Sequence, residues 1–81
     1  MSDINQAFCR SLLSMIMPEV KKVTTAAERK AVWVYRYPRD HWEFHGPNDF
    51  YWYGSAGNAW DARYHGWSAW LRKHHPELEA A

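Results

Sequence analysis

Three titratable side chains occupy alternate positions of one short segment: His41, Glu43 and His45. This spacing places them on one face of a β-strand, with successive members about 6.8 Å apart. Two imidazoles and a carboxylate suit zinc or another divalent metal, and a further ligand would have to come from His65, His74 or His75. The alternative, which we favour, is a polar strand face open to solvent, with no metal and no cofactor.

A second grouping, Asp61, His65 and Ser68, falls at helical spacing and resembles an oriented base beside a hydroxyl. Nucleophilic catalysis also needs a pocket and oxyanion donors, and the sequence indicates neither. Cys9 lies in an apolar helical pattern, which is typical of a buried structural thiol. The sequence contains no phosphate-binding glycine loop, paired-cysteine motif or nucleophile elbow, so we expect no enzyme.

Size and composition indicate one dense domain over residues 1–81. Aromatic residues make up 17% of the chain, and each can bury roughly 150–250 Å². The net charge of +1 lacks the basic excess of a general nucleic-acid binder and the acidic excess of a DNA mimic. A single cysteine and a first segment without the pattern of a signal peptide favour a cytoplasmic protein, and no apolar run is long enough to cross a membrane.

Basic residues occur in two different settings, one within the last predicted helix and one after the first. Arg63 projects within an aromatic helical stripe, where it either stacks on an indole ring or reaches a partner. The segment after the first predicted helix is basic, and Arg36 and Arg39 would extend it. With aromatic neighbours it could contact phosphates and bases; the alternative is a solvated charged segment. Its residues are Lys21, Lys22, Arg29 and Lys30.

Apolar residues at helical spacing predict a first helix, and Pro18 predicts its end or a kink near Met17, or the first position of a continuing turn. Thr25 and Glu28 form a capping box for a short helical turn. β-Branched and aromatic residues then predict three strands, at 31–37, 41–45 and 50–53, which form an antiparallel meander. The fold class is therefore α+β, in the order α-β-β-β-α.

The last element is a predicted helix over about residues 56–74, capped by Ser55 or Asn58 and followed by fraying over 77–81. Its helical angles define three faces. The buried aromatic stripe is Trp60, Tyr64, Trp67, Trp70 and Leu71. The flank of small residues, which allows close approach of another backbone, is Ala59, Ala62, Gly66 and Ala69. The polar face is Asn58, Asp61, His65, Ser68 and Arg72.

Two-residue turns at Pro38-Arg39 and Pro47-Asn48 would pair Tyr37 with Asp40 and His45 with Phe50. This register gives one aromatic sheet face, made of Trp33, Tyr35, Trp42, Phe44, Tyr51 and Tyr53. The other, mixed face carries Val32, Val34, Arg36, His41, Glu43, His45, Phe50 and Trp52. We expect both helices to cover the aromatic face and leave the mixed face open, although one helix on each face is the alternative and a slip of one residue would exchange the faces.

The α-β-β-β-α order resembles that of double-stranded RNA-binding domains over most of the chain. Those domains carry lysines at the start of the last helix, where this chain has Ser55-Ala-Gly-Asn-Ala-Trp-Asp61, so no RNA-binding residue is carried over. As a short, single-domain chain it also resembles small accessory proteins of bacteriophages, including anti-CRISPR proteins. That resemblance implies a non-catalytic inhibitor that occupies the surface of a bacterial host complex.

The sequence therefore favours a small protein-binding module, because Trp, Tyr and Arg dominate interface energies and an exposed apolar face indicates a binding site. A nucleic-acid-binding domain that uses the basic segment, and a homodimer that completes the aromatic face with a second copy, are the alternatives. The residues expected to contact a protein partner are Arg36, Arg39, His41, Glu43, His45, Trp52 and Arg63.

Overall fold

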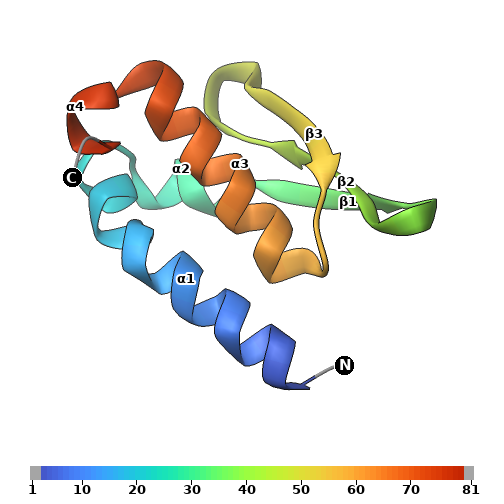
Figure 1. The fold of residues 1–81 in the computed structure, drawn as a ribbon. Helices are drawn as coiled ribbons and strands as arrows, with labels where there is room; N and C mark the ends of the chain where they lie inside the picture. Colours follow the sequence, from blue (N-terminus) through green and yellow to red (C-terminus); the bar gives the residue numbers. More distant parts are fainter. Residues whose placement is uncertain (1–2, 80–81) are drawn as a thin grey trace.

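A computed structural model describes residues 3–79 of the chain (Figure 1). The elements are α1 (Asp3–Lys22), α2 (Ala26–Lys30), β1 (Trp33–Tyr37), β2 (His41–His45), β3 (Tyr51–Ser55), α3 (Ala59–His74) and α4 (Pro76–Glu79). The three strands form one antiparallel sheet in the order β1-β2-β3. The predicted α+β fold, a three-stranded meander with an N-terminal and a long C-terminal helix, is confirmed.

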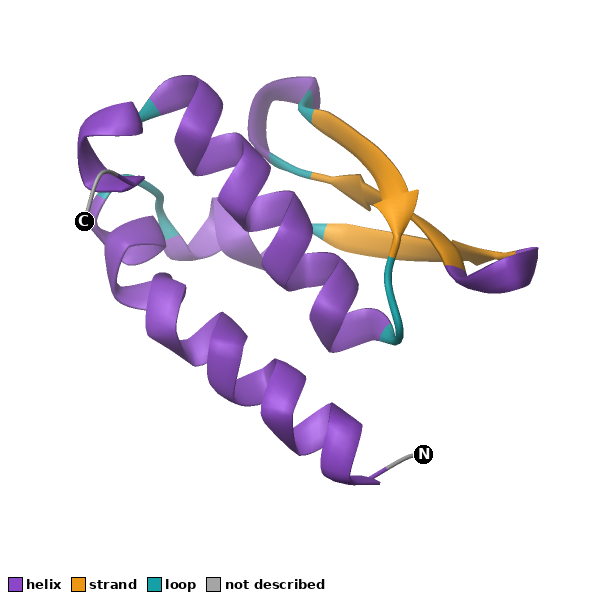
Figure 2. Ribbon diagram, in the orientation of Figure 1, coloured by secondary structure: helices purple, strands orange, loops and turns teal. Residues whose placement is uncertain are grey.

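The prediction that both long helices cover one face of the sheet is wrong. Helix α3 lies between α1 and the sheet (Figure 2). α1 packs mainly on α3, and the two run side by side in the same direction (Figure 1). The starts of both helices meet where the Asn58 side chain donates to Cys9 Sγ at 3.7 Å. α3 therefore covers the sheet, and α1 completes the core with residues such as Leu13 and Val20.

The core sits where α3 meets the central strand. Phe44 of β2 is fully buried and packs edge-to-face on Trp67, with their ring centroids 5.4 Å apart. Ala62 and Gly66, from the predicted small-residue flank, are also buried, which lets the helix approach the strand closely. Trp70 and Leu71 of the predicted aromatic stripe are buried as well, whereas Trp60 remains 36% exposed.

The predicted sheet register is wrong by one residue at both turns. Tyr37 pairs with His41, and His45 pairs with Tyr51. The loops contain three residues, Pro38–Asp40 and Pro47–Asp49, because the last two residues of each loop have positive φ angles of 55–65°. Since side chains alternate along a strand, this shift turns β2 over relative to the predicted pairing. Trp42 and Phe44 therefore face α3, together with Val34 and Trp52.

Three helix boundaries differ from the sequence-based expectation. α1 does not end at Met17 but continues through Pro18 to Lys22, because Pro18 faces solvent while Val20 beyond it is fully buried. α3 begins at Ala59 with Asn58 as its N-cap, one of the two predicted caps. The predicted fraying from residue 77 is replaced by α4, whose Leu78 packs against the core; residues 80–81 lie outside the described part.

Candidate functional site

The face of the sheet that points away from α3 is a grid of three residues on each of three strands. We call it the open face; across the strands its rows are Trp33–His45–Tyr51, Tyr35–Glu43–Tyr53 and Tyr37–His41–Ser55. Trp33, Tyr35, Tyr51 and Tyr53 are each about half exposed, at 49%, 52%, 51% and 52%. Glu43 stands at the centre of the grid.

The carboxylate of Glu43 organises the open face through hydrogen bonds from all three strands. The phenols of Tyr37 and Tyr51 both donate to Oε2, at 2.5 and 3.0 Å. Oε1 lies 2.7 Å from Nε2 of His45. Because an ionised carboxylate only accepts hydrogen bonds, His45 must carry its hydrogen on Nε2. Four side chains are thereby held in fixed positions.

These contacts also shift the pKa values of Glu43, Tyr37 and Tyr51. The hydrogen bond from Tyr37, followed by that from His45, lowers the pKa of Glu43 below its ordinary value, so the carboxylate is charged at neutral pH. The same bond to Glu43 raises the pKa of Tyr37 to about 12. Burial, and then the hydrogen bond to Glu43, raise the pKa of Tyr51. The centre of the open face therefore carries one stable negative charge among neutral phenols.

Ring contacts connect the rest of the grid. Trp33 stacks on His45 with centroids 3.8 Å apart and planes 3° from parallel. Tyr53 stacks on His41 at 5.7 Å and meets the edge of Tyr37 at 5.8 Å. Each exposed ring thus has a neighbour that restricts its rotation, so the open face is a pre-arranged surface.

Two of the predicted contact residues lie on the covered side of the sheet. Trp52 is half-buried, packs into the core and stacks on His65 of α3 at 5.7 Å, so its predicted exposure is wrong. Arg36 shares the covered side, but it lies at the edge strand, where its guanidinium pairs with Asp40 at 3.0 Å and lies over Trp42. The one-residue change in register accounts for both.

The remaining predicted contact residues divide between the open face and distant sites. His41, Glu43 and His45 lie together on the open face, as their alternation along β2 predicted. Arg39 is exposed in the loop between β1 and β2. Arg63 lies over the Trp60 ring at 5.5 Å and donates to the Ala59 carbonyl at 3.4 Å, which is the predicted stacking within the fold.

The candidate metal ligands are engaged with other partners. Glu43 and His45 bond to each other, while His41 Nε2 lies 3.5 Å from Ser55 Oγ and its ring stacks on Tyr53. Within residues 3–79, no group of three His, Cys, Asp or Glu side chains is arranged to hold a metal ion. In this structure the three side chains of the strand face make their contacts within the sheet.

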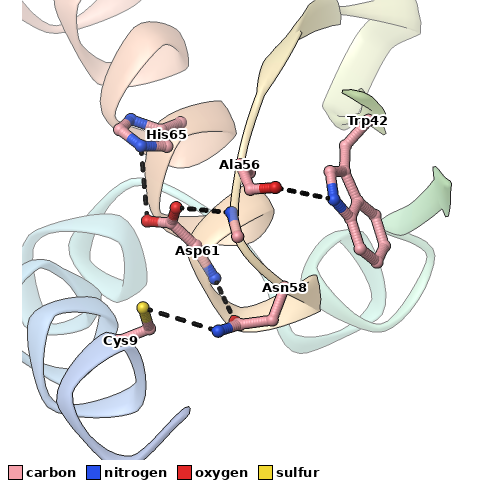
Figure 3. Close-up of polar contacts among 7 residues, drawn as sticks. Cys9, Trp42, Ala56, Asn58, Asp61 and His65 are labelled. Carbon is pink, nitrogen blue, oxygen red and sulfur yellow. Dashed lines mark hydrogen bonds and ion pairs between the residues drawn. The ribbon is translucent and has the colours of Figure 1, made fainter. Parts of the chain in front are cut away.

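The Asp61–His65 pair belongs to the junction between β3 and α3 (Figure 3). Asp61 pairs with His65 Nε2 at 3.3 Å and accepts from the backbone N–H of Gly57 at 3.0 Å, while Asn58 caps the backbone N–H of Asp61. Ser68, predicted on the polar face, is instead only 8% exposed. The carboxylate thus stabilises the helix start, and the buried hydroxyl is closed to a substrate.

The residues of the basic segment lie on α1 and α2, away from the strands that form the open face. Lys21 and Lys22 occupy the last turn of α1, where Lys22 pairs with Glu19 at 3.5 Å. Arg29 donates to both the carbonyl and the hydroxyl of Thr24 at 3.0 Å, which ties it to its own loop. Lys30 is exposed at the end of α2. The basic and aromatic surfaces are thus carried by different elements.

Sequence reasoning placed four exposed aromatic residues, Trp33, Tyr35, Tyr51 and Tyr53, under the helices. A signal for the correct arrangement was present in the loops, since Pro38-Arg39-Asp40 and Pro47-Asn48-Asp49 share the pattern Pro-X-Asp. Asn and Asp tolerate positive φ better than other non-glycine residues. Two consecutive residues of that conformation make a three-residue loop, which sets the observed register.

No protein-family model matches the sequence, and comparisons with curated proteins and with solved structures found no match. Within residues 3–79, no helix combines the length and apolar character that spanning a membrane requires.

Proposed function

We propose that this chain is a non-catalytic binding module that docks on a protein partner through the open face. The observation that supports this is the exposure of about half of each of four large aromatic side chains on one side of a three-stranded sheet. Exposed aromatic surface gathered in one place marks interaction sites. Trp and Tyr are also the residues that contribute most to binding energy when a partner covers them.

The arrangement of the open face favours binding because it is set before a partner arrives. Tyr37, His45 and Tyr51 are bonded to Glu43, and the indole of Trp33 is stacked on His45. Ordering a free side chain at an interface costs about 0.5–1.5 kcal/mol, a cost that pre-positioned rings largely avoid. The phenol and indole groups also supply polar contacts at the edge of an apolar surface.

A protein partner accounts for this surface better than nucleic acid does. The open face contains no Lys or Arg, and Glu43, whose carboxylate is ionised at neutral pH, is its one acidic residue. Phosphate contacts from basic residues supply most of the affinity for nucleic acid. The more specific hypothesis of a phage-type inhibitor of a bacterial host complex stays a prediction.

Selection of short peptides from a random displayed library tests the proposal. The wild-type protein should enrich binders that a Tyr35→Ser, Tyr53→Ser double variant fails to retain. Phe8→Ser is the matched control, because Phe8 is 63% exposed on α1 and should leave binding unchanged. Peptides retained equally by the double variant, or lost equally with Phe8→Ser, would rule out the open face as the docking surface.

A further inference from the structure

The open face has one acidic residue, and it stands at the centre. Of its nine residues, Glu43 is the one Asp, Glu, Lys or Arg, and Tyr35 and Tyr53 lie directly across from it on the neighbouring strands. Its hydrogen-bond donors are two phenols and an imidazole. The phenols are neutral, so they satisfy the carboxylate without cancelling its charge.

Glu43 retains one unused acceptor position. An ionised carboxylate offers roughly four lone-pair sites. Two donors occupy Oε2 and one occupies Oε1, so the remaining position is on Oε1. The side chain is 17% exposed, so a group that approaches from solvent can reach part of it. The faces of the surrounding aromatic rings are electron-rich and add to the attraction for a cation.

On the basis of the proposed function, we infer that the partner protein places a cationic side chain, arginine or lysine, at the centre of the open face. Its N–H donates to Oε1 of Glu43 and its charged group lies against the rings of Tyr35 and Tyr53. The cation supplies the countercharge that a buried carboxylate needs once the partner has excluded water. The surrounding rings supply apolar area, and the ion pair fixes the orientation of the partner.

The same charge argues against a second copy of this chain as the occupant. In a two-fold symmetric interface the same patch meets itself, so two copies packed face to face would bring Glu43 close to Glu43. Two carboxylates excluded from water without a cation repel each other strongly. A phosphate backbone would meet the same repulsion. A cationic protein surface is the complement that both the charge and the rings favour.

A titration with a capped amino acid tests the cation site alone. N-acetyl-L-arginine amide, added to isotope-labelled protein, should cause saturable NMR shifts centred on Tyr35, Glu43 and Tyr53. The α-amide of N-acetyl-L-glutamate should cause none. Glu43→Gln should abolish the response, while Glu19→Gln, which removes a carboxylate on α1 outside the open face, should preserve it. Shifts that are absent with the arginine probe, or that persist unchanged in Glu43→Gln, overturn the inference.

The selected peptides provide the second readout and separate this inference from the proposed function. Peptides that bind the open face should be enriched in Arg or Lys, and their affinity should fall with added NaCl. On Glu43→Gln their affinity should fall about tenfold, which corresponds to about 1.4 kcal/mol. Peptides that need Tyr35 and Tyr53 but ignore both Glu43 and salt would overturn the cation site and leave the proposed function standing. Sedimentation of a dimer that the Tyr35→Ser, Tyr53→Ser variant abolishes would overturn both.

Discussion

Gly66 of α3 lies so close to Phe44 of β2 that a Cβ at this glycine would stand 2.0 Å from Cγ of the phenylalanine ring. Both residues are buried. This contact sets the distance between α3 and the central strand. Because the helix rests on Phe44, the opposite side of the same strand presents Glu43 to solvent. The core contact and the open face therefore lie on opposite sides of β2.

Gly66→Ala should destabilise the protein by about 1–3 kcal/mol, the usual cost of forcing extra volume into a packed core. For a domain of this size the melting temperature should fall by about 4–8 °C for each kcal/mol. Gly57→Ala is the control, since its added Cβ meets only Asp61 Oδ2 at 3.9 Å. Thermal unfolding of both variants is the measurement; equal melting temperatures would show that the helix is not seated on Phe44.

Pro18→Ala should stabilise the protein, because α1 runs unbroken through this position. A proline inside a helix costs about 3 kcal/mol, and its restriction of the unfolded chain offsets about 1 kcal/mol of that. Urea unfolding should therefore show a gain of about 2 kcal/mol. Pro76→Ala is the comparison, since Pro76 begins α4, where its missing N–H is not needed. A Pro18→Ala variant no more stable than the wild type would contradict a continuous α1.

The order of elements was predictable because each segment has a strong local pattern. The alternation in His41–His45 and the aromatic and small-residue faces of residues 59–74 need no long-range information. Pro18 misled because tertiary burial of Val20 outweighs the local preference to end the helix. Local propensity therefore identified the elements, and packing decided where α1 ends.

Trp52→Ala should mainly lower stability, whereas Trp33→Ala should mainly weaken binding. Trp52 packs beneath α3 against His65, so its removal should cost about 2–4 kcal/mol of unfolding free energy. Trp33 is 49% exposed and rests on His45, so its removal should cost about 1 kcal/mol or less. Chemical denaturation compares the two.

Peptide binding by the folded variants provides the second half of that comparison. Trp33→Ala should weaken the selected peptides, whereas Trp52→Ala should retain them at temperatures where it remains folded. Binding that depends on Trp52 and ignores Trp33 would mean that the covered side, not the open face, meets the partner.

The candidate site was only partly predictable, and the reason lies in two loops. The grouping of His41, Glu43 and His45 follows from alternation within one strand, so it was found. The identity of their neighbours depends on whether each loop contains two or three residues, and Arg39 with a φ of 65° is an unusual choice for the longer loop. A one-residue difference exchanged Trp52 for Tyr53 on the open face. Alternation within a strand predicts which residues share one side of that strand. Loop conformation decides which sides of neighbouring strands lie on the same face of the sheet.

The hydrogen bonds of Glu43 predict that their contribution to stability is constant over a range of pH and is lost at both the acid and the alkaline end. The folded-state pKa of Glu43 is lowered by Tyr37, His45 and Tyr51, so its contribution is complete above the ordinary value of 4.5 and is lost as pH falls through the lowered pKa. The pKa of Tyr37 is raised from 10.0 to about 12, so its contribution is complete below pH 10.0 and is lost as pH rises toward 12. Denaturant midpoints across this range should trace the plateau.

Absorbance of ionised tyrosine isolates the Tyr37 part of this prediction. The wild type should contain a phenol with a pKa of about 12, and Tyr37→Phe should lack it. In Glu43→Gln the pKa of Tyr37 should return toward 10.0, since the largest cause of its shift is the hydrogen bond to that carboxylate. Ionisation of all five tyrosines near pH 10.0 in the wild type would mean that the carboxylate of Glu43 does not accept a hydrogen bond from Tyr37. A late-titrating Tyr37 would instead require the closed hydrogen-bond network, because a freely solvated carboxylate on an exposed strand shifts a neighbouring phenol far less.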